Sequence, residues 1–501
     1  PDEAFITRGK MALHKESKKV PILLGLSGVA LVLVGVVAGL AASGESSRSM
    51  FINAVQMTAI AEHLQEFERI ARVDGNHDSR SVINGYNMSA AYVQRVLIER
   101  TDLHVWIQEF EVPLYREIEP PTIAVGPLEL TVLRDFQGLR GGGHGSFNIT
   151  APVKLISNFG CDAEDWAVTG GERVIAIVDL AVTDDCDYWT KAKHADQTDG
   201  VEAILIARGE DQRSLGLPGG LITKMNWVAG DYVSEIPGLG ISYSTRQVLL
   251  LAGADATITV NAETIMTPTH NVIAESRRGD DDNIVVLGAH LDSVVAGPGI
   301  NDNGSGSALI LELALQYSHV KSPSSKVVFA WWGAEEIGIM GSAHYVKELT
   351  EAERAAHVCN LNFDMMGSPN GQPQLHNGTL SPPGTKPEVI EKSNRITDLY
   401  IEAFEEEEVV WTATAMTGGS DFYPFILDQI PTGGLNSGAG ALKSVELRNR
   451  VGGLANTPMD PCYHLHCDDV VNLGTSIMAK IMKAAARVLY TLATDASIMA
   501  C

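Results

Sequence analysis

Apolar side chains near the start of the chain recur at roughly helical spacing. The pattern covers residues 50–73 and returns over residues 89–99. Spacing of this kind places apolar residues on one face of a helix, whereas the apolar–polar alternation at 105–112 is typical of a strand. We therefore predict two helices followed by a strand.

From residue 270 onwards, short apolar runs rich in valine and isoleucine alternate with longer segments of helical spacing. This alternation is typical of α/β folds, in which parallel strands are buried on both faces. We therefore expect an α/β fold with a mainly parallel central sheet flanked by helices. The three strands on which the chemistry depends are predicted at 284–288, 327–331 and 359–363.

The stretch from residue 145 to about 263 has a different pattern. Its apolar runs are short, include 256–261, and are separated by segments rich in turn-forming residues. The glycine-rich sequence at 138–145 precedes it and is typical of a flexible break. We interpret residues 131–264 as an α/β module inserted into a main domain that comprises 51–130 and 265–501.

An apolar segment without charges covers the 23 residues 20–42 and follows Lys15, Lys18 and Lys19. A helix of that length spans about 30 Å of hydrocarbon. Either it is a signal anchor with a cytosolic tail at 1–19, or it is a cleaved signal peptide, as the small residues 41–44 allow. Both interpretations place the rest of the chain in the secretory pathway, membrane-anchored in the first case and secreted or vacuolar in the second.

Composition narrows the classes of function. The chain has 501 residues, enough for two or three domains, and a net charge of -25. A polyanion repels the phosphate backbone, which argues against nucleic acid as a partner. Glycosylation sequons at Asn87, Asn148 and Asn377 agree with a secretory route.

The six cysteines suit an oxidising compartment. Cys161 with Cys186, and Cys462 with Cys467, are close enough in the sequence to pair. Cys359 lies in an apolar stretch, where we expect a buried free thiol.

Residues with metal-binding side chains follow each of the three predicted strands. In open α/β sheets, ligands gather at the carboxyl ends of the strands. Each motif alone has a simpler explanation, such as a surface acid pair or a helix cap, but their joint placement predicts a metal site. These residues are His290 and Asp292, then Glu335 and Glu336, then Asp364, together with Asp302 in the glycine-rich loop 299–306 and His464 in a later loop.

The ligand types indicate zinc, which binds imidazole nitrogen and carboxylate oxygen. Two imidazoles and three carboxylates give each of two ions three protein ligands if one carboxylate bridges. Glu335 is then left as the general base, and Asp292 could hold the second nitrogen of the His290 imidazole. The five ligands would be His290, Asp302, Glu336, Asp364 and His464.

Five longer motifs resemble the di-zinc aminopeptidases of peptidase family 28, which include secreted and vacuolar enzymes. The resemblance covers roughly residues 51–501 and implies a zinc-exopeptidase fold with two zinc ions per chain. The motifs are GAHLDSVVAGPGINDNGSGSA at 288–308, WWGAEEIGIMGSAHYV at 331–346, NFDMMGS at 362–368, GGSDFYPFILDQIPTGGL at 418–435 and DPCYHLHCDD at 460–469.

The resemblance assigns roles to single residues. It implies that His290 and Asp364 bind one zinc, that Glu336 and His464 bind the other, and that Asp302 bridges them. Glu335 is then the base, and the ligand directly after Tyr463 is His464 rather than His466. The resemblance also implies a Cys462–Cys467 disulfide and identifies 131–264 as a protease-associated domain. Tyr463 either donates to the developing oxyanion or only packs beside the cysteine pair.

The expected reaction is hydrolysis of the first peptide bond of a peptide with a free N-terminus. Water attacks the carbonyl, Glu335 moves its proton to the leaving amine, and Glu335 with Asp364 holds the substrate ammonium. The resemblance and nearby apolar residues suggest large hydrophobic N-terminal residues such as leucine. These residues, most of which could equally belong to the core, are Met365, Met366, Phe422, Phe425 and Ile426.

Two alternatives remain open. A carboxypeptidase or dipeptidase on the same scaffold would need cations for the substrate carboxylate, and Lys443, Arg448 and Arg450 are available in the sequence. A receptor or adhesion ectodomain would be expected to have lost ligands or the base, whereas this chain retains all of them.

Overall fold

A computed structural model describes residues 46–74, 78–180, 186–210, 217–218, 220, 227–228, 231, 233–416 and 418–499. The predicted tail 1–19, the apolar segment 20–42 and the last residue lie outside these ranges. Among the helices of the described residues, none is long and apolar enough to cross a membrane.

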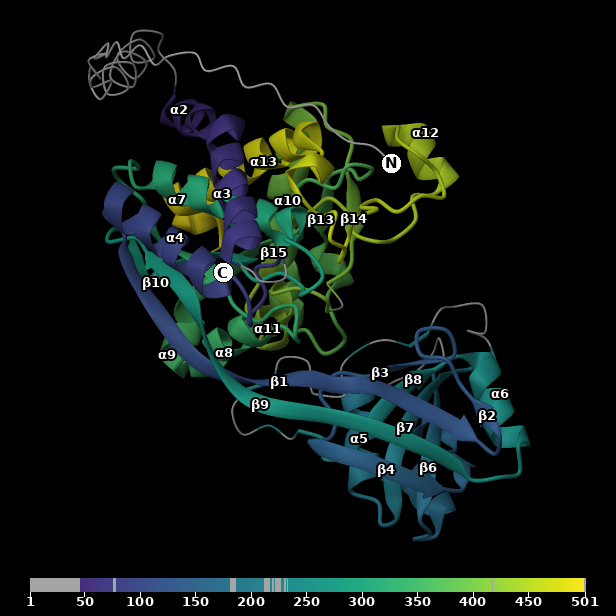
Figure 1. The fold of residues 1–501 in the computed structure, drawn as a ribbon. Helices are drawn as coiled ribbons and strands as arrows, with labels where there is room; N and C mark the ends of the chain where they lie inside the picture. The colour runs from purple at the N-terminus through teal and green to yellow at the C-terminus, as the bar shows by residue number, and fades with distance from the viewer. Residues whose placement is uncertain are drawn as a thin grey trace, which may run out of the picture. The chain divides into compact units, whose positions relative to one another are not determined.

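The main sheet has ten strands, nine of them in the order β14-β13-β15-β12-β10-β11-β9-β1-β2, while β4 pairs with β9 (Figure 1). Its centre is parallel, because β10 pairs in parallel with both β11 and β12, and β12 with β15. One flank is antiparallel, where β11, β9, β1 and β2 follow one another. The strands are β1 His104–Val125, β2 Leu128–Glu129, β4 Gly145–Ala151, β9 Ala256–Glu275, β10 Asp280–His290, β11 Ser325–Trp332, β12 His357–Phe363, β13 Gln374–His376, β14 Thr412–Thr414 and β15 Thr432–Asn436.

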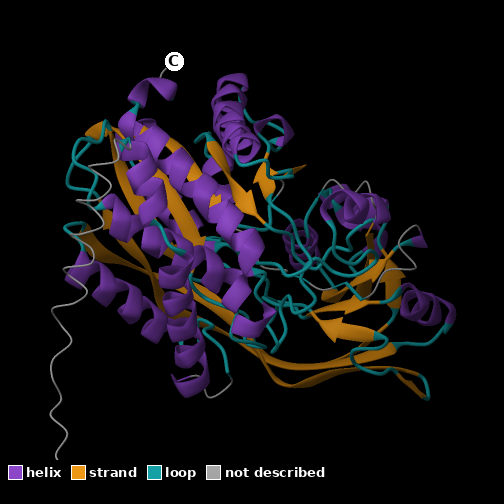
Figure 2. Cartoon of the chain, turned by 90° about the horizontal axis from the view of Figure 1, so that it is seen from above, coloured by secondary structure: helices purple, strands orange, loops and turns teal. Residues whose placement is uncertain are grey.

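Helices cover both faces of this sheet (Figure 2), because successive side chains of a strand point to opposite faces. Val285 and Leu287 of β10 pack into a core with α3, α4, α7, α10 and α13, whereas Val286 packs into a second core with α8 and α11. The predicted α/β class with a central sheet flanked by helices is therefore confirmed. The helices are α2 Ser47–Ala54, α3 Met57–Asp74, α4 Tyr86–Arg100, α7 Ser305–Tyr317, α8 Met340–Glu348, α9 Glu351–Ala356, α10 Pro387–Glu406, α11 Phe422–Leu427, α12 Val445–Val451 and α13 Thr475–Thr494.

The two helices predicted near the start are confirmed, with one interruption. The stretch predicted as a single helix at 50–73 is divided between α2 and α3, which are separated by two residues. The helix predicted at 89–99 lies within α4. Short helical turns complete the described part of the chain at η1 Asn158–Gly160, η2 Ala163–Thr169, η4 Ile300–Gly304, η5 Gly378–Leu380, η6 Val470–Asn472 and η7 Ala496–Ile498.

A second sheet lies within the stretch predicted as an inserted module. Its five strands have the order β3-β8-β7-β6-β5, and the pairs β5–β6, β6–β7 and β7–β8 are parallel. Residues 256–261 form the start of β9, a strand of the main sheet. The elements are β3 Phe136–Gly138, β5 Val153–Leu155, β6 Val174–Leu180, β7 Val201–Arg208 and β8 Gly238–Ile241, with the helices α5 Tyr188–Asp196 and α6 Tyr243–Leu251.

Two long strands connect the sheets. β1 and β9 pair antiparallel along almost their whole length, and Figure 1 shows them running from the main sheet to the second one. Ile123 of β1 and Ile258 of β9 share a core with Ile175 and Leu205 of the second sheet. The second sheet is thus packed against the distal ends of these strands.

Both predicted disulfides are present. Cys161 pairs with Cys186 beside the second sheet, and Cys462 pairs with Cys467 in the loop that carries His464. Cys359 is a buried free thiol, as expected.

Candidate metal centre

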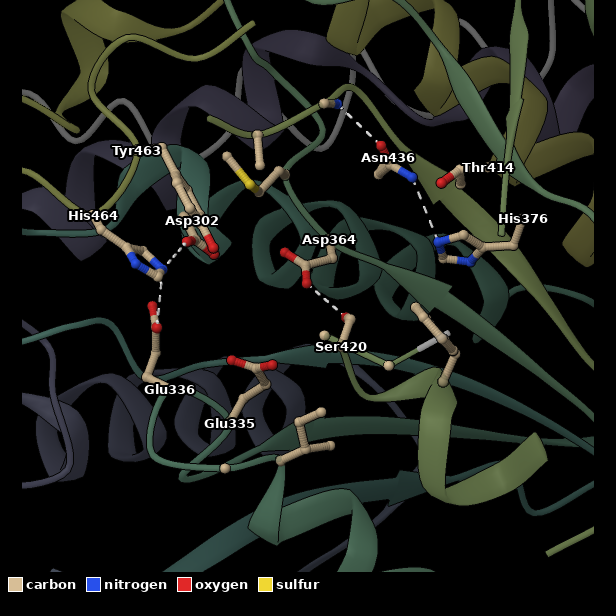
Figure 3. Close-up of a pocket in the computed structure, with 18 of the residues that line it drawn as sticks. Asp302, Glu335, Glu336, Asp364, His376, Thr414, Ser420, Asn436, Tyr463 and His464 are labelled. Carbon is tan, nitrogen blue, oxygen red and sulfur yellow. Dashed lines mark hydrogen bonds and ion pairs between the residues drawn. The ribbon is translucent and has the colours of Figure 1, made fainter. Parts of the chain in front are cut away.

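The carboxyl ends of three neighbouring parallel strands bring the predicted residues together (Figure 3). His290 is the last residue of β10, Glu335 and Glu336 follow β11, and Asp364 follows β12. Because β10 lies between β11 and β12, side chains that are far apart in the sequence converge at one edge of the sheet.

Asp302 lies between the two imidazoles. Its Oδ1 is 3.3 Å from Nε2 of His290, and its Oδ2 is 3.1 Å from Nε2 of His464. Asp364 Oδ1 is 3.5 Å from the same nitrogen of His290, while Glu336 Oε2 is 3.2 Å from that of His464. The donor atoms therefore form two groups, each with one imidazole and one terminal carboxylate, joined by Asp302.

The donor set fits divalent cations. Ligand atoms of His290, Asp302 and Glu336 lie within 4.8 Å of one another, and all three residues are buried. Asp364 Oδ1 is also buried and has no hydrogen-bond partner in the part of the chain that the structure describes. A buried carboxylate oxygen without a partner is costly, and a cation bonded to it would remove that cost.

The acidic groups strongly perturb the imidazoles. Burial lowers the pKa of His464, but hydrogen bonds to Asp302 and Glu336 outweigh it and raise that pKa to about 10. Burial, followed by the charge of Asp302, raises the pKa of Glu336 to about 7. So many acidic groups in one buried site need positive charge close by, which bound cations would provide.

The loop that presents Asp302 is held by buried hydrogen bonds. The carboxylate of Asp468 accepts the backbone N–H groups of Asn301 and Asp302 at 2.8 and 2.9 Å. Asn303 accepts the N–H of Gly306 at 2.9 Å and donates to the carbonyl of Phe363 at 2.9 Å. The asparagine and aspartate residues of this motif thus shape the loop and fix it to the end of β12.

Arg80 supports the segment 291–299, which precedes the loop with Asp302. This fully buried guanidinium donates to the backbone carbonyls of Leu291, Pro298 and Gly299. Gly299 has a φ of 62°, and a Cβ there would lie 2.3 Å from the carbonyl oxygen of Asp302. A side chain at this glycine would therefore displace the loop that carries Asp302.

Asp292 makes different contacts from those expected. Its carboxylate oxygens accept the backbone N–H groups of Glu335 and Glu336 at 3.1 and 3.2 Å. His290 Nδ1 donates to the backbone oxygen of Asp292 at 3.1 Å, while the Asp292 carboxylate lies 3.8 Å from that nitrogen. Asp292 therefore orients the acidic pair Glu335–Glu336 as well as the imidazole.

Glu335 points into the space bordered by Glu336 and Asp364 (Figure 3). Its Oε2 is 3.9 Å from His290 Nε2, and no group in the described part of the chain donates a hydrogen bond to its carboxylate. Burial, followed by the charges of nearby Asp421, Glu336 and Asp364, raises its pKa well above the usual range. The carboxyl group is thus free to contact a molecule in the cavity, and positive charge nearby would favour its ionised form.

Tyr463 stacks on His464, with ring centroids 3.8 Å apart and planes inclined by 26°. Both residues line the cavity, whereas His466 is exposed and does not. Burial and the surrounding carboxylates raise the pKa of Tyr463, so its hydroxyl keeps its proton at neutral pH.

The cavity has a volume of about 330 Å³. Of the apolar residues named from the sequence, Met365 and Phe422 line it, while Met366, Phe425 and Ile426 are fully buried in the cores. Three polar residues, His376, Thr414 and Asn436, line it too, with Asn436 Nδ2 3.5 Å from His376 Nε2 (Figure 3).

The three basic residues considered in the sequence analysis for binding a substrate carboxylate do not line the cavity. Lys443 is buried and donates to the carbonyls of Gly371 and Gly452 at 3.2 and 3.1 Å. Arg448 and Arg450 belong to the exposed helix α12 and do not line the cavity.

Several residues of the site were not identified from the sequence. Ser420 donates to Asp364 Oδ2 at 2.6 Å, and Asp468 holds the Asp302 loop. Both lie inside quoted motifs, GGSDF and CDD, so their position beside predicted ligands was the available signal. Arg140 had no such signal, because it reaches the cavity from the connection between β3 and β4 within residues 131–264, which contain the second sheet and are here called the second sheet's segment.

Comparison with known proteins gives concordant matches. The protein-family model described as Peptidase family M28 matches residues 271–489. The chain is 34% identical over 446 residues to an aminopeptidase of Pseudomonas aeruginosa, which covers 84% of this chain and 78% of that protein. It is 30% identical over 444 residues to aminopeptidase Y of Saccharomyces cerevisiae, with coverages of 83% and 74%.

Solved structures share the fold. An aminopeptidase from Aneurinibacillus sp. strain AM-1 superposes with a TM-score of 0.68 at 21% identity, covering 89% of this chain and 96% of that one. A zinc aminopeptidase from Bacillus subtilis gives a TM-score of 0.59 at 20% identity, with coverages of 88% and 96%.

Proposed function

The chain belongs to peptidase family M28, and on that premise we propose that it is a zinc aminopeptidase with Glu335 as its general base. Its substrates are peptides with a free N-terminus, above all those that begin with a large hydrophobic residue such as leucine. The observation that carries the proposal is the position of Asp302, whose two oxygens each approach a different imidazole.

Two zinc ions would be held by the two groups of donors. His290 and Asp364 would bind one ion, Glu336 and His464 the other, and Asp302 both. Imidazole and carboxylate are the ligands that catalytic zinc takes, with a position left open. Bound zinc would supply Lewis-acid polarisation of the substrate carbonyl and make water more acidic.

Glu335 is the residue for proton transfer. A general base must reach the proton it takes within hydrogen-bond distance, directly or through one water molecule. The Glu335 carboxylate faces the cavity, and Asp292 fixes its backbone N–H at 3.1 Å. Glu335 takes a proton from the attacking water and delivers it to the nitrogen of the leaving amine.

Tyr463 supports the developing oxyanion. Its hydroxyl is protonated, the residue lines the cavity, and stacking on His464 orients the ring. A preorganised donor of this kind stabilises charge that appears only in the transition state. The packing interpretation of Tyr463 predicts instead that Tyr463→Phe leaves kcat unchanged.

The acidic end of the cavity suits a substrate ammonium. Glu335 and Asp364 both line it, so a free α-ammonium there would face two acidic side chains. The side chain of the N-terminal residue would then contact Met365, Ile339 and Phe422. These apolar residues support the preference for leucine, although His376 at the same cavity makes the wall partly polar.

Two further features concern the setting of the enzyme. The disulfides Cys161–Cys186 and Cys462–Cys467 support an extracellular or vacuolar location. We assign the second sheet and its connecting segments, within 131–264, to a protease-associated domain.

The test compares leucine p-nitroanilide with an N-acetylated peptide that has a free carboxylate, after purification with and without a chelator. We expect hydrolysis of the anilide alone, loss of activity after chelation and recovery with zinc, at two zinc ions per chain by metal analysis. Cleavage of the acetylated peptide alone would instead assign the chain to the carboxypeptidases.

A further inference from the structure

A guanidinium from the second sheet's segment reaches the acidic cavity. Arg140 lies in the connection between β3 and β4, and it lines the cavity together with Glu335, Glu336 and Asp364. Its Nη1 donates to the backbone carbonyl of Glu336 at 3.0 Å. It is the only arginine or lysine among the described residues that line this cavity.

The rest of this guanidinium is available to a ligand. Arg140 is exposed and forms no ion pair with an acidic side chain of the described residues. One of its five N–H donors is engaged by the Glu336 carbonyl, which leaves the planar fork able to accept a carboxylate. Arginine pairs with carboxylates through two parallel hydrogen bonds, which gives direction as well as attraction.

The backbone around Arg140 is fixed relative to the loop that carries Glu335 and Glu336. The N–H of Arg140 donates to the carbonyl of Gly220 at 3.0 Å, and the N–H of Gly143 donates to that of Ser234 at 3.0 Å. Buried Trp227, seven residues after Gly220, shares a core with Ala334, which directly precedes Glu335. Arg140 is therefore held next to the Glu335–Glu336 loop.

The cavity is therefore lined by both acidic and basic side chains, which complement the two charged ends of a peptide. Carboxylates that suit a substrate ammonium and a guanidinium that suits a carboxylate border one space of about 330 Å³. That volume is at the lower end of the ~300–1,000 Å³ typical of small-molecule sites. Two or three extended residues span roughly 7–11 Å, so only a short peptide could place both of its charged ends here.

We propose that Arg140 determines specificity by binding the C-terminal carboxylate of a short peptide, so that the enzyme prefers dipeptides and tripeptides. The proposal rests on the aminopeptidase function and deepens it by naming a substrate class. The inserted segment then contributes directly to substrate selection. The competing role for Arg140 is purely structural, as a fastener between the second sheet's segment and the Glu336 loop.

The experiment compares Leu-Gly with Leu-Gly amide, which share the scissile bond and the free ammonium and differ only at the C-terminus. The ratio of their kcat/KM values is measured for the zinc-loaded full chain and for R140M, R140K and R134M. Arg134 is the matched control, because it lies in the same segment, pairs with Asp135 at 2.7 Å and does not line the cavity.

We expect the wild type to favour the acid by about five- to tenfold, a modest factor because solvent screens an exposed pair. R140M should bring the ratio to about one, chiefly through KM, and R140K should give an intermediate value because a lysine is not bidentate. R134M should keep the wild-type ratio.

Equal ratios in the wild type and R140M would overturn the proposal. If R140M lowered both kcat/KM values by the same factor, Arg140 would be a fastener and the proposal would again be wrong. If the wild type cleaved leucine p-nitroanilide but had equal kcat/KM values for Leu-Gly and Leu-Gly amide, only the proposed role of Arg140 in carboxylate binding would fail. Failure to cleave the anilide and both peptides would overturn the proposed function itself.

Discussion

The molecule contains two regions of parallel strands that differ in the residues at their carboxyl ends. In the main sheet, β10, β11 and β12 lead to His290, the pair Glu335–Glu336, and Asp364. In the second sheet, β7 ends in Arg208 and is followed by Gly209, and β8 is followed by Ser242, which caps α6. In both sheets the strands pair through backbone hydrogen bonds, and apolar side chains of the strands are buried in cores.

The difference shows that the architecture alone does not make a site. Parallel strands bring their carboxyl ends to one edge, but chemistry appears only where the residues at that edge carry suitable groups. The main sheet has five potential ligands and a candidate base there, and hydrogen bonds with Asp468 and Arg80 hold the backbone of residues 298–302 beside them. Substitutions in each of the two sheets can test this contrast, beginning with the largest effect.

Glu335→Gln should have the largest effect on catalysis. The amide cannot take a proton, so kcat for leucine p-nitroanilide should fall by about 10²–10⁴-fold. Zinc content should remain at the wild-type value, since Glu335 is not a ligand in the proposed arrangement. The matched control is Asp179→Asn near the end of β6 in the second sheet. If both variants lost kcat equally, the contrast between the sheets would be false.

Asp292→Asn should have an intermediate effect. The carboxylate accepts two backbone N–H groups, and asparagine would place its own donor against one of them. An unsatisfied buried N–H costs about 1–3 kcal/mol, and loss of a residue that orients ligands lowers activity or metal affinity by about 10–100-fold. We expect a fall of that size in kcat/KM, together with weaker zinc binding in a chelator competition.

The control for Asp292→Asn lies at the other end of the same strand. Asp280 is exposed at the start of β10, and its replacement by asparagine should change kcat/KM by less than about twofold. An effect of Asp280→Asn equal to that of Asp292→Asn would mean that general acidity, rather than position at the carboxyl end, matters for β10.

The two disulfides allow stability and activity to be separated between the regions. Cys161 and Cys186 are 25 positions apart in the sequence and Cys462 and Cys467 are five apart, so a chain-entropy model gives about 3–4 and about 2 kcal/mol. Replacing the first pair by serine should lower Tm more. Replacing the second should lower kcat/KM more, because that loop presents His464 to the cavity. Thermal unfolding and leucine p-nitroanilide kinetics on both variants would check this, and the reverse ranking would contradict it.

How far the sequence predicted these regions depends on the range of the interactions involved. The strands before His290, Glu335 and Asp364 were predicted because their apolar runs are local signals, and both disulfides followed from spacing. The length of β1 and β9 was missed, because the distal halves of these strands are set by pairing with each other and by packing on the second sheet. A polar stretch such as that around Glu117 in β1 gives no local strand signal.

The site shows the same limit. The candidate ligands were predicted from their motifs taken together, whereas the contacts of Ser420 and Asp468 were not, since these residues act through tertiary hydrogen bonds. Asp292 was assigned to the imidazole, but its carboxylate serves the backbone of the next strand's loop. Arg140 could not be foreseen, because its place in the cavity depends on how the inserted segment packs against the main domain.

The smallest effect on activity should come from a change in the ion pair between β6 of the second sheet and helix α6. Asp179 accepts two hydrogen bonds from Arg246 of α6, one of them 2.6 Å long, and both side chains are largely shielded from water. Asp179→Asn removes the charge and sets an amide donor against the guanidinium, which should cost about 1–2 kcal/mol, between the values for exposed and buried pairs. Tm should fall by about 2–4 °C or less. Because leucine p-nitroanilide has no carboxylate for Arg140 to bind, its kcat/KM should stay within about twofold of wild type. A larger loss of anilide kcat/KM at a temperature well below Tm would mean that the second sheet shapes the metal centre itself, and the functional separation of the two sheets would have to be abandoned.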